Sequence, residues 1–375
     1  MKKVIEGSHA IAEAVRLCAP KVIAAYPITP QTHIVEKLAE MVANGDIDAE
    51  YINVESEHSA MAACIGAQAT GVRTFTATCS QGLALMWELL YVASGMRLPI
   101  VMAVTNRALS APLNIWGDWS DSMGTRDSGW IQLYCKNAQE ALDTTIQAYR
   151  IAEQTMIPVM VCVDGFYLSH TLEPVDIPET LNGFVGRYEP KVELNPEKPV
   201  TQGAYATPDY YQEFKETQHR AIEDSEDIIK NVHDEFANKF SRSYGNGVME
   251  TWNMNNAKHA IVTMGTVSGT IKHVISNENI KDIGILRLRS FRPFPSEEIK
   301  KVLEGIESVG VIEKDISPGI GGALYVETKA AVKNPVCSFI TGLGGRDTTP
   351  ADIKHVFSIV RKNDTGIHWL GSKLG

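Results

Sequence analysis

The chain has 375 residues, of which 44% are hydrophobic and 21% are charged. This composition is that of an ordinary globular protein and excludes a largely disordered or fibrous chain, and the length favours two domains. With 35 basic and 45 acidic residues the formal charge is −10, which makes the chain a poor candidate for a general binder of nucleic acid or of anionic membranes.

The start of the sequence and its apolar stretches show no targeting or membrane signal. Glu6, His9 and Glu13 interrupt any apolar core of a signal peptide. The longest apolar runs, residues 99–104 and 157–163, have the length of a strand and not of a membrane span. We therefore expect a cytoplasmic protein.

The six cysteines are widely spaced. None forms a C-x-x-C pair, and the closest two are Cys64 and Cys79. Iron–sulfur clusters and structural zinc draw on closely spaced cysteines, so we expect buried, reduced thiols and no metal site on this chain. His58 likewise has no His or Cys at ligand spacing, and we expect it to pack.

Hydrophobic periodicity in the first half alternates between that of strands and that of helices. Strands are predicted at residues 21–25, 50–54, 73–78, 99–104 and 159–164. Helices are predicted at residues 8–17, with Ser8 as a candidate N-cap, and at residues 31–42, 59–70, 83–93 and 138–155. Because the strands are apolar on both faces and alternate with helices, we expect an α/β fold with a parallel sheet covered by helices on both faces.

The character of the sequence changes near residue 172. Prolines cluster up to Pro208 and a polar helical run then covers residues 210–240, so residues 172–247 are interpreted as a connector with one long helix. The predicted domains are residues 1–171 before it and residues 248–375 after it. The second is a smaller α/β unit with strands at 259–264, 282–288, 308–313 and, last, 336–340, and helices at 269–275, 296–303 and 319–329.

Three predicted strand ends of the first unit carry polar side chains suited to chemistry. Thr29 stands in a stiff turn between two prolines, Glu57 precedes an Ala-rich helix, and Arg107 follows a buried strand. Ligands of parallel sheets bind beyond the carboxyl ends of the strands. A hydroxyl, an acid aimed at a ligand's ring nitrogen and a cation for a carboxylate or phosphate would meet there.

Each of these residues also has a purely structural interpretation. Thr29 would cap a helix, and Glu57 would interact with the helix dipole from the first turn. Arg107 would form an ion pair with Asp118 or Asp121. The sequence pattern alone leaves both interpretations open.

Two further kinds of feature are candidates for contacts with ligands or partners. Residues 117–130 form a long irregular run, and with Trp116, Trp119 and Trp130 they favour a buried subunit interface. The turn at residues 319–322 is a second candidate partner surface. Glycine-rich turns that would either hold an anion or simply open helices lie at residues 265–269, 319–322 and 342–347.

Long segments of the sequence resemble one enzyme family. Residues 24–32 (AAYPITPQT), 54–88 (VESEHSAMAACIGAQATGVRTFTATCSQGLALMWE) and 106–130 (NRALSAPLNIWGDWSDSMGTRDSGW) are similar to the alpha subunits of 2-oxoacid:ferredoxin oxidoreductases, most closely of the pyruvate:ferredoxin oxidoreductases. The likeness extends over essentially the whole chain, including residues 164–178 (DGFYLSHTLEPVDIP). It implies a thiamine diphosphate-binding fold, with the pyrimidine-binding domain first and a domain like the C-terminal domain of transketolase second.

The resemblance also implies how cofactors are distributed among subunits. In this family a beta subunit holds most of the thiamine diphosphate, with Mg²⁺ and a [4Fe-4S] cluster, a ferredoxin-like delta subunit holds further clusters, and a gamma subunit completes the enzyme. The implied reaction is the reversible oxidative decarboxylation of pyruvate with coenzyme A to acetyl-CoA and CO₂. Ferredoxin carries the electrons.

Three residues of this sequence match functional residues of the family. Glu57 matches the glutamate that hydrogen-bonds the aminopyrimidine ring and stabilises its imino tautomer. Thr29 matches the threonine beside the thiazolium ring and the substrate, and Arg107 matches the arginine that pairs with the substrate carboxylate. These roles are what the resemblance implies.

Three other functions stay open at this point. The first is a related oxidoreductase that acts on 2-oxoisovalerate, 2-oxoglutarate or oxalate. The second is a cluster-free thiamine diphosphate enzyme of the transketolase or decarboxylase type. The third is a non-catalytic scaffold that only organises its partners.

Overall fold

The computed structural model describes residues 1–374. Its larger sheet has seven strands in the order β12-β6-β7-β5-β4-β2-β3. Neighbouring strands are parallel except β12 and β6, which are antiparallel. The strands are β2 (Val22–Ala25), β3 (Glu50–Asn53), β4 (Thr74–Thr78), β5 (Val101–Asn106), β6 (Ile131–Tyr134), β7 (Val159–Asp164) and β12 (Ser290–Arg292).

The middle strands of this sheet are buried along their whole length, as their apolar sequences predict. Helix α3 packs on β2 and β4, and α7 packs on β5 and β7. The predicted α/β fold with a parallel-rich sheet is therefore confirmed. The helices of this unit are α1 (Gly7–Cys18), α2 (Thr32–Ala43), α3 (Glu57–Ala69), α4 (Ser80–Leu85), α5 (Trp87–Gly95), α6 (Ser120–Gly124) and α7 (Ala138–Thr155).

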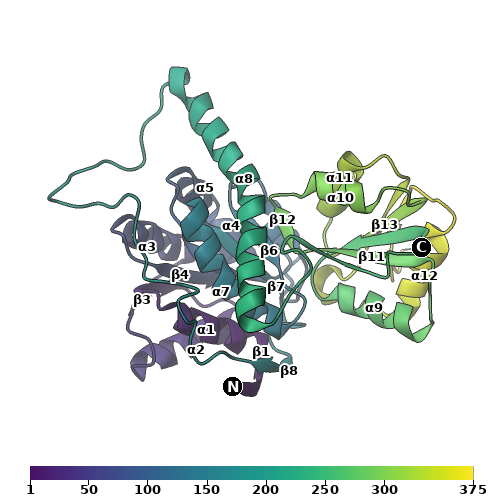
Figure 1. Cartoon of the computed structure of the whole chain (residues 1–375), viewed down its shortest axis with the longest axis horizontal. Coiled ribbons are helices and arrows are strands. Elements are labelled where there is room, and N and C mark those ends of the chain that lie inside the picture. The colour runs from purple at the N-terminus through teal and green to yellow at the C-terminus, as the bar shows by residue number, and fades with distance from the viewer. Residues whose placement is uncertain (375) are drawn as a thin grey trace.

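A smaller sheet forms the core of the second unit, at the right of Figure 1. Its order is β15-β14-β13-β10-β11-β9, and only β9 (Met249–Trp252) runs antiparallel to its neighbour. The other strands are β10 (His259–Thr263), β11 (Ile283–Leu288), β13 (Ser308–Glu313), β14 (Val336–Ile340) and β15 (Ile367–Trp369). The helices are α9 (Val267–Asn277), α10 (Ser296–Val302), α11 (Ala323–Ala331), the 3-10 turn η1 (Leu343–Gly345) and α12 (Pro350–Val360).

Between the two units the chain forms a strand, a long irregular segment and one long helix (Figure 1). Strand β8 (Leu172–Asp176) pairs antiparallel with β1 (Lys2–Glu6). Helix α8 (Pro208–Phe240) has 33 residues, so it is about 50 Å long. Its buried residues, which begin at Ser225, lie in the half that packs on α7.

A buried ion-pair cluster fastens the second unit to α7. Both Arg287 and Arg289 donate to the carboxylate of Glu140, at 3.0 Å and 2.6 Å. Burial alone would raise the pKa of Glu140, but the two guanidinium groups outweigh it and lower the pKa to about 2. In addition, β12 follows β11 in sequence but lies at the edge of the larger sheet. The two units are therefore closely joined.

Three details of the sequence-based prediction are wrong. Ser8 is not an N-cap, because the chain leaves β1 and enters α1 directly at Gly7. The predicted helix 83–93 is two helices, α4 and α5, which meet at Met86. Strand β14 is not the last, because α12 and the three-residue β15 follow it.

Within residues 1–374, no helix combines the length and apolar composition that crossing a membrane requires.

Candidate active site

The three candidate residues lie at one edge of the larger sheet. Thr29 lies in the turn after β2, Glu57 begins α3 shortly after β3, and Arg107 directly follows the last residue of β5. Strands β5, β4, β2 and β3 are consecutive neighbours, and all four are parallel. Their carboxyl ends therefore open on the same side, where ligands of such sheets bind.

The guanidinium of Arg107 is buried without an acidic partner. Arg107 is only 7% exposed, and its guanidinium donates to two backbone carbonyl oxygens, that of Thr29 at 2.8 Å and that of Asn114 at 3.0 Å. No carboxylate within residues 1–374 forms an ion pair with it, so the predicted alternative pairing with Asp118 or Asp121 is wrong. Because only carbonyl oxygens accept from this buried cation, its remaining N–H groups are available to donate to the carboxylate or phosphate of a ligand.

The side chain of Thr29 is exposed at the edge of this site. Its carbonyl oxygen accepts from Arg107 and, at 3.2 Å, from the thiol of Cys79. Thr29 is not a helix cap, because α2 begins at Thr32 with Gln31 in the N-cap position. Gln31 stiffens the turn from below by donating to the carbonyl oxygen of Ala77 at 2.6 Å. The Thr29 hydroxyl is thus free to contact a ligand.

The carboxyl group of Glu57 is nearly enclosed. Glu57 is 6% exposed, and no other residue of the described chain donates a hydrogen bond to its carboxyl group. The cap of α3 is made by Ser56, whose side chain accepts from the backbone of Ser59 at 3.2 Å. Burial raises the pKa of Glu57. A carboxyl group with these properties shares a proton readily with a ring nitrogen placed against it.

A glycine allows α4 to approach this carboxyl group closely. A Cβ added at Gly82 would lie 2.5 Å from Oε1 of Glu57 and 2.5 Å from Oγ1 of Thr78. The hydroxyl of Thr78 is itself buried and has no hydrogen-bond partner within residues 1–374. Gly82 therefore sets the position of Glu57 relative to the end of β4, a role that the sequence pattern did not reveal.

Asp121 connects the two halves of the site. Its carboxylate accepts from the backbone N–H of Ser80 at 2.8 Å, of Arg107 at 3.0 Å and of Ser122 at 2.7 Å, and from the side-chain amide of Asn106 at 2.8 Å. Burial raises the pKa of Asp121 to about 6. Because Ser80 begins α4 and Arg107 directly follows β5, Asp121 fixes the helix beside Glu57 relative to Arg107. The sequence marked Asp121 only as a candidate ion-pair partner.

Carboxylates of this chain accept backbone hydrogen bonds at or beside the three glycine-rich turns. In the turns at 265–269 and 342–347 the donor lies within the turn, and for the turn at 319–322 it is Leu324 in the following helix α11. The donor–acceptor pairs are Thr266 to Asp164 (2.8 Å), Leu324 to Glu313 (2.8 Å) and Gly344 to Asp118 (3.0 Å).

The tryptophans of the 117–130 region divide between core and surface. Trp119 and Trp130 are 0% and 1% exposed, and their indole N–H groups donate inside the chain, to Asp164 and to the carbonyl oxygen of Leu90. Only Trp116, at 50% exposed, remains on the surface. The expectation that all three tryptophans belong to a subunit interface is wrong for Trp119 and Trp130, which are buried inside this chain.

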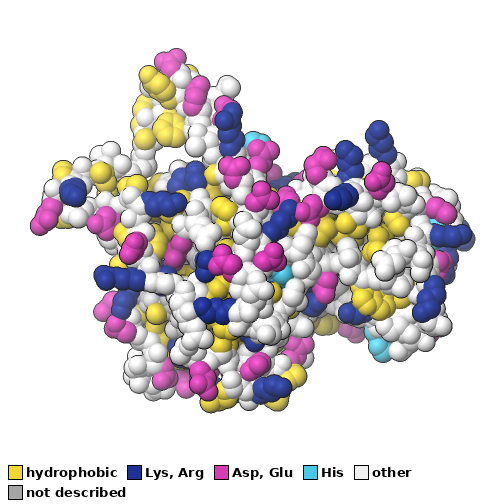
Figure 2. All heavy atoms as spheres, viewed as in Figure 1, with side chains coloured by type: hydrophobic (Ala, Val, Ile, Leu, Met, Phe, Trp, Pro, Cys, Tyr) yellow, Lys and Arg dark blue, Asp and Glu magenta, His cyan; other side chains and the backbone are white. Residues whose placement is uncertain are grey.

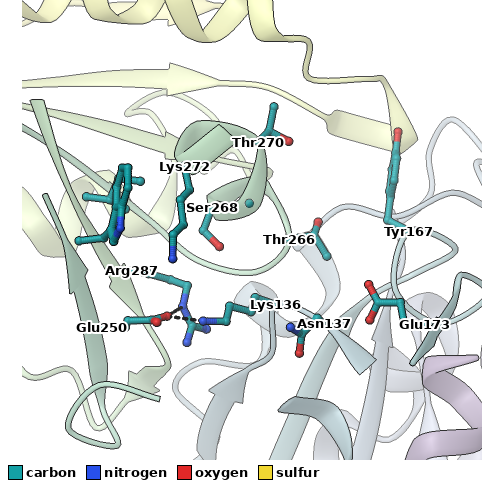
Figure 3. Close-up of a pocket in the computed structure, with 13 residues that line it drawn as sticks. Lys136, Asn137, Tyr167, Glu173, Glu250, Thr266, Ser268, Thr270, Lys272 and Arg287 are labelled. Atoms are coloured by element: carbon teal, nitrogen blue, oxygen red, sulfur yellow. Dashed lines mark hydrogen bonds and ion pairs between the residues drawn. The ribbon is translucent and has the colours of Figure 1, made fainter. Parts of the chain in front are cut away.

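A cavity of about 480 Å³ lies between the two units. Its lining includes Lys136 and Tyr167, which follow the carboxyl ends of β6 and β7, but not Thr29, Glu57 or Arg107. Figure 3 shows the Glu250 carboxylate in contact with both Lys136 and Arg287, which it binds at 2.6 Å and 2.9 Å. The charges of Glu250, Lys136 and Arg287 in the cavity lining therefore compensate one another.

Within residues 1–374 no three His, Cys, Asp or Glu side chains are placed to hold a metal ion, and the six cysteines are buried with free thiols.

The comparisons with known proteins agree with this geometry. The family model described as pyruvate flavodoxin/ferredoxin oxidoreductase, thiamine diphosphate-binding, matches residues 13–234. The chain belongs to this family. Core domain II of pyruvate:ferredoxin oxidoreductase matches residues 257–353 of this oxidoreductase subunit.

Relatives of this family are similar over nearly their whole length. The pyruvate synthase subunit PorA of Methanocaldococcus jannaschii is 55% identical, over 99% of this chain and 98% of that protein. The subunit PorA of Methanothermobacter thermautotrophicus is 48% identical, also over 99% and 98%. The ketoisovalerate oxidoreductase subunit VorA of Pyrococcus horikoshii is 44% identical, over 96% of this chain and 94% of that protein.

Two solved structures show a related fold. The 2-oxoglutarate:ferredoxin oxidoreductase of Magnetococcus marinus superposes with a TM-score of 0.73 at 19% identity, and the match covers 97% of this chain but only 65% of that one. A split-gene transketolase superposes with a TM-score of 0.52 at 11% identity, over 96% of this chain and 99% of that one. The thiamine diphosphate-binding fold predicted from the sequence is confirmed by the family match together with these structures.

Proposed function

We propose that this chain is the alpha subunit of a pyruvate:ferredoxin oxidoreductase (pyruvate synthase). The enzyme converts pyruvate and coenzyme A reversibly to acetyl-CoA and CO₂, with ferredoxin as electron carrier. The observation that carries the proposal is the 55% identity to a pyruvate synthase subunit PorA over nearly the full length of both chains. In this proposal the chain works in the cytoplasm with beta, gamma and delta subunits.

The candidate active site fits one part of thiamine diphosphate. Glu57 offers an enclosed carboxyl group with a raised pKa and no competing hydrogen bond from the described chain, which suits a ring nitrogen of the aminopyrimidine. Thiamine diphosphate, when bound, supplies the carbon nucleophile for the 2-oxo group and accepts the electron pair of the broken bond. Glu57 holds the proton at the ring nitrogen, and Gly82 keeps this carboxyl group in place.

Arg107 and Thr29 would bind the 2-oxo acid in this proposal. The buried guanidinium pairs with the substrate carboxylate, and the exposed Thr29 hydroxyl donates to the oxygen on which charge develops. Because Arg107 is anchored to the carbonyl oxygen of Thr29, both contacts are fixed relative to each other. This pair orients the carboxylate for its loss as CO₂.

The remaining cofactors are assigned to partner subunits. No three metal-binding side chains come together within residues 1–374, and internal carboxylates already accept a backbone N–H at or beside each of the three glycine-rich turns. Both observations support a diphosphate and Mg²⁺ site on the beta subunit and [4Fe-4S] clusters on beta and delta. Coenzyme A enters as a co-substrate of the assembled enzyme.

Turnover of a panel of 2-oxo acids by the purified complex tests the substrate. We expect coenzyme A-dependent reduction of ferredoxin, with kcat/KM for pyruvate about 10-fold or more above that for 2-oxoisovalerate, 2-oxoglutarate or oxalate, since one added or missing group in a pocket discriminates by such factors. Highest kcat/KM with 2-oxoisovalerate would favour the second candidate, which the 44% identity to a VorA subunit supports. An active complex without iron would contradict the ferredoxin-linked reaction.

A further inference from the structure

The first turns of α8 extend beyond the rest of the molecule and bury no side chain. Residues 208–217 are all exposed, and the buried residues of the helix begin only at Ser225. Figure 1 shows this end rising above the other helices. A short helical segment in water is only marginally stable, because helices in proteins depend mainly on packing of an apolar face. The segment therefore lacks the buried apolar face that such a helix normally has.

This segment presents aromatic side chains to solvent. Tyr205 is 93% exposed, Tyr210 is 64% exposed, and Tyr211 and Phe214 are each 56% exposed. We call residues 205–217 the aromatic arm. In Figure 2 apolar side chains gather at its tip. Contiguous exposed aromatics mark protein interfaces, where Tyr and Trp contribute much of the binding energy.

The aromatic arm is continuous with apolar surface near the candidate active site. The ammonium group of Lys215 lies 6.0 Å from the ring centre of Tyr91 and 5.8 Å from that of Tyr211. Tyr91 packs edge-to-face on Trp87, which is 51% exposed. Trp87 begins α5, directly after the α4 helix that carries Gly82. A partner seated on the arm would thus extend toward the edge that holds Glu57.

Charge decides between a second copy of this chain and a different partner. The segment 208–224 carries two basic side chains and five acidic ones, namely Asp209, Glu213, Glu216, Glu223 and Asp224. The chain as a whole carries −10. A second copy would bring acidic groups against acidic groups, which opposes association. A partner with an apolar face edged by Lys and Arg is complementary instead.

We propose that the aromatic arm docks a different subunit of the same enzyme through an apolar face edged by basic side chains. The inference rests on the proposed function, which requires partner subunits at the edge that holds Glu57. The triple variant Tyr210→Ser/Tyr211→Ser/Phe214→Ser tests it. We expect the Kd for the partner subunits, measured by titration and native mass spectrometry of the co-expressed complex, to rise about 30-fold or more.

A charge variant and a control separate docking from folding. Glu213→Lys/Glu216→Lys should weaken assembly at low salt and lose this effect at high salt, because screening removes exposed charge interactions. Val4→Ser/Leu172→Ser, which alters side chains 68% and 64% exposed on β1 and β8, should leave the Kd unchanged. All three variants should keep the wild-type Tm, since every altered side chain is exposed.

Two outcomes would overturn the docking proposal. One is a full set of subunits with an unchanged Kd in the triple variant. The other is a wild-type chain that dimerises through the arm while its partners bind elsewhere. Pyruvate turnover, measured separately on the wild-type complex, tests the proposed function alone. A complex without pyruvate turnover whose assembly still depends on the arm would refute that function and leave the docking site standing.

Discussion

The guanidinium of Arg107 and the backbone of Thr29 are joined by a hydrogen bond of 2.8 Å between Nη1 and the carbonyl oxygen. This bond reaches from the end of β5 to the turn after β2, although β4 lies between these strands in the sheet. Because backbone carbonyls and not carboxylates hold the guanidinium, its positive charge stays available to a ligand while its position is fixed in advance.

Arg107→Lys should lower kcat/KM for pyruvate by about 30- to 150-fold, which corresponds to roughly 2–3 kcal/mol for lost charge-assisted hydrogen bonds. Lysine keeps the charge, but one ammonium group cannot donate to Thr29, to Asn114 and in a fork to a carboxylate. Steady-state kinetics of the complex measure the effect. Arg126→Lys, in the same region, is the control and should leave kcat/KM near the wild-type value; equal losses in both variants would contradict the assigned role.

Glu57→Gln should reduce kcat by about 10²- to 10⁴-fold, because a neutral amide cannot hold a shared proton at the ring nitrogen. Stability should not fall at pH 7. Burial raises the pKa of Glu57 in the folded chain above its ordinary value of 4.5. The stability that Glu57 contributes is therefore fully present below pH 4.5 and is lost as the pH rises through the raised pKa. Activity and Tm are measured together, with Glu55→Gln, at an exposed acid, as the control. Full activity of Glu57→Gln would instead favour the non-catalytic scaffold.

Gly82→Ala should displace the Glu57 carboxyl group, because the added Cβ would lie 2.5 Å from Oε1 of Glu57. We expect weaker binding of thiamine diphosphate to the complex, about 10-fold or more in Kd by titration, from a misplaced charge-assisted hydrogen bond. Gly66→Ala in the neighbouring α3 meets no atom within 4 Å. It should bind the cofactor normally and gain about 0.5–1 kcal/mol of stability. Normal binding by Gly82→Ala would show that this close contact has no role.

The location of the candidate active site could be predicted from the sequence because each of its three residues follows a predicted strand. Thr29 and Arg107 follow the apolar strands β2 and β5, Glu57 follows the more polar strand β3, and parallel strands direct their carboxyl ends to one edge. What supports these residues could not be predicted. Asp121 stands in an irregular stretch, and only the folded chain brings Ser80 and Arg107 to its carboxylate.

The same limit explains why strand β12 is missing from the sequence-based prediction. Strand β12 has three residues and pairs with β6 of the other unit, so neither its length nor its neighbourhood produces a periodic signal. A glycine-rich turn that holds an internal carboxylate has the same local sequence as one that holds a phosphate. Whether Gly344 faces Asp118 or a ligand depends on a contact between residues far apart in the chain.

Asp164→Asn should lower the free energy of unfolding by about 3–5 kcal/mol, because it leaves a buried lysine without its partner. Asp164 accepts from Trp119 at 2.6 Å and from Thr266 at 2.8 Å, and its carboxylate lies 3.3 Å from the ammonium group of Lys314. Burial would raise the pKa of Asp164, but Lys314 and these hydrogen bonds outweigh it and lower the pKa. Its stabilising contribution is therefore present above the ordinary value of 3.8 and is lost as the pH falls through the lowered pKa.

Denaturant titrations of this variant at several pH values test that account. Asp282→Asn, which removes a half-exposed pair with Arg361, is the control and should cost less than about 1 kcal/mol. The double variant Asp164→Asn/Lys314→Met should recover part of the loss, since no buried charge is then left alone. Equal losses at Asp164 and Asp282 would mean that burial adds nothing to the first pair.

Asp121→Asn should lower kcat/KM at pH 8 by about 10- to 100-fold and remove an acid limb from the pH profile. The wild-type carboxylate uses its lone pairs for four N–H donors, and protonation below its pKa of about 6 takes one acceptor away. Wild-type kcat/KM should therefore fall as the pH falls through about 6. Stability should depend on pH in the direction opposite to activity. Because the pKa of Asp121 is raised from 3.8 to about 6 in the folded chain, its contribution to the free energy of unfolding decreases as the pH rises toward 6.

Because kcat/KM and stability should respond to pH in opposite directions, measuring both distinguishes a positioning role of Asp121 from a general loss of structure. The readout is kcat/KM and Tm of the same complex from pH 5 to pH 8, with Asp127→Asn, at an exposed acid of the same region, as the control. The control should keep the wild-type acid limb. If Asp121→Asn also kept that limb, another group would be responsible for it, and Asp121 would only join β5 to α4.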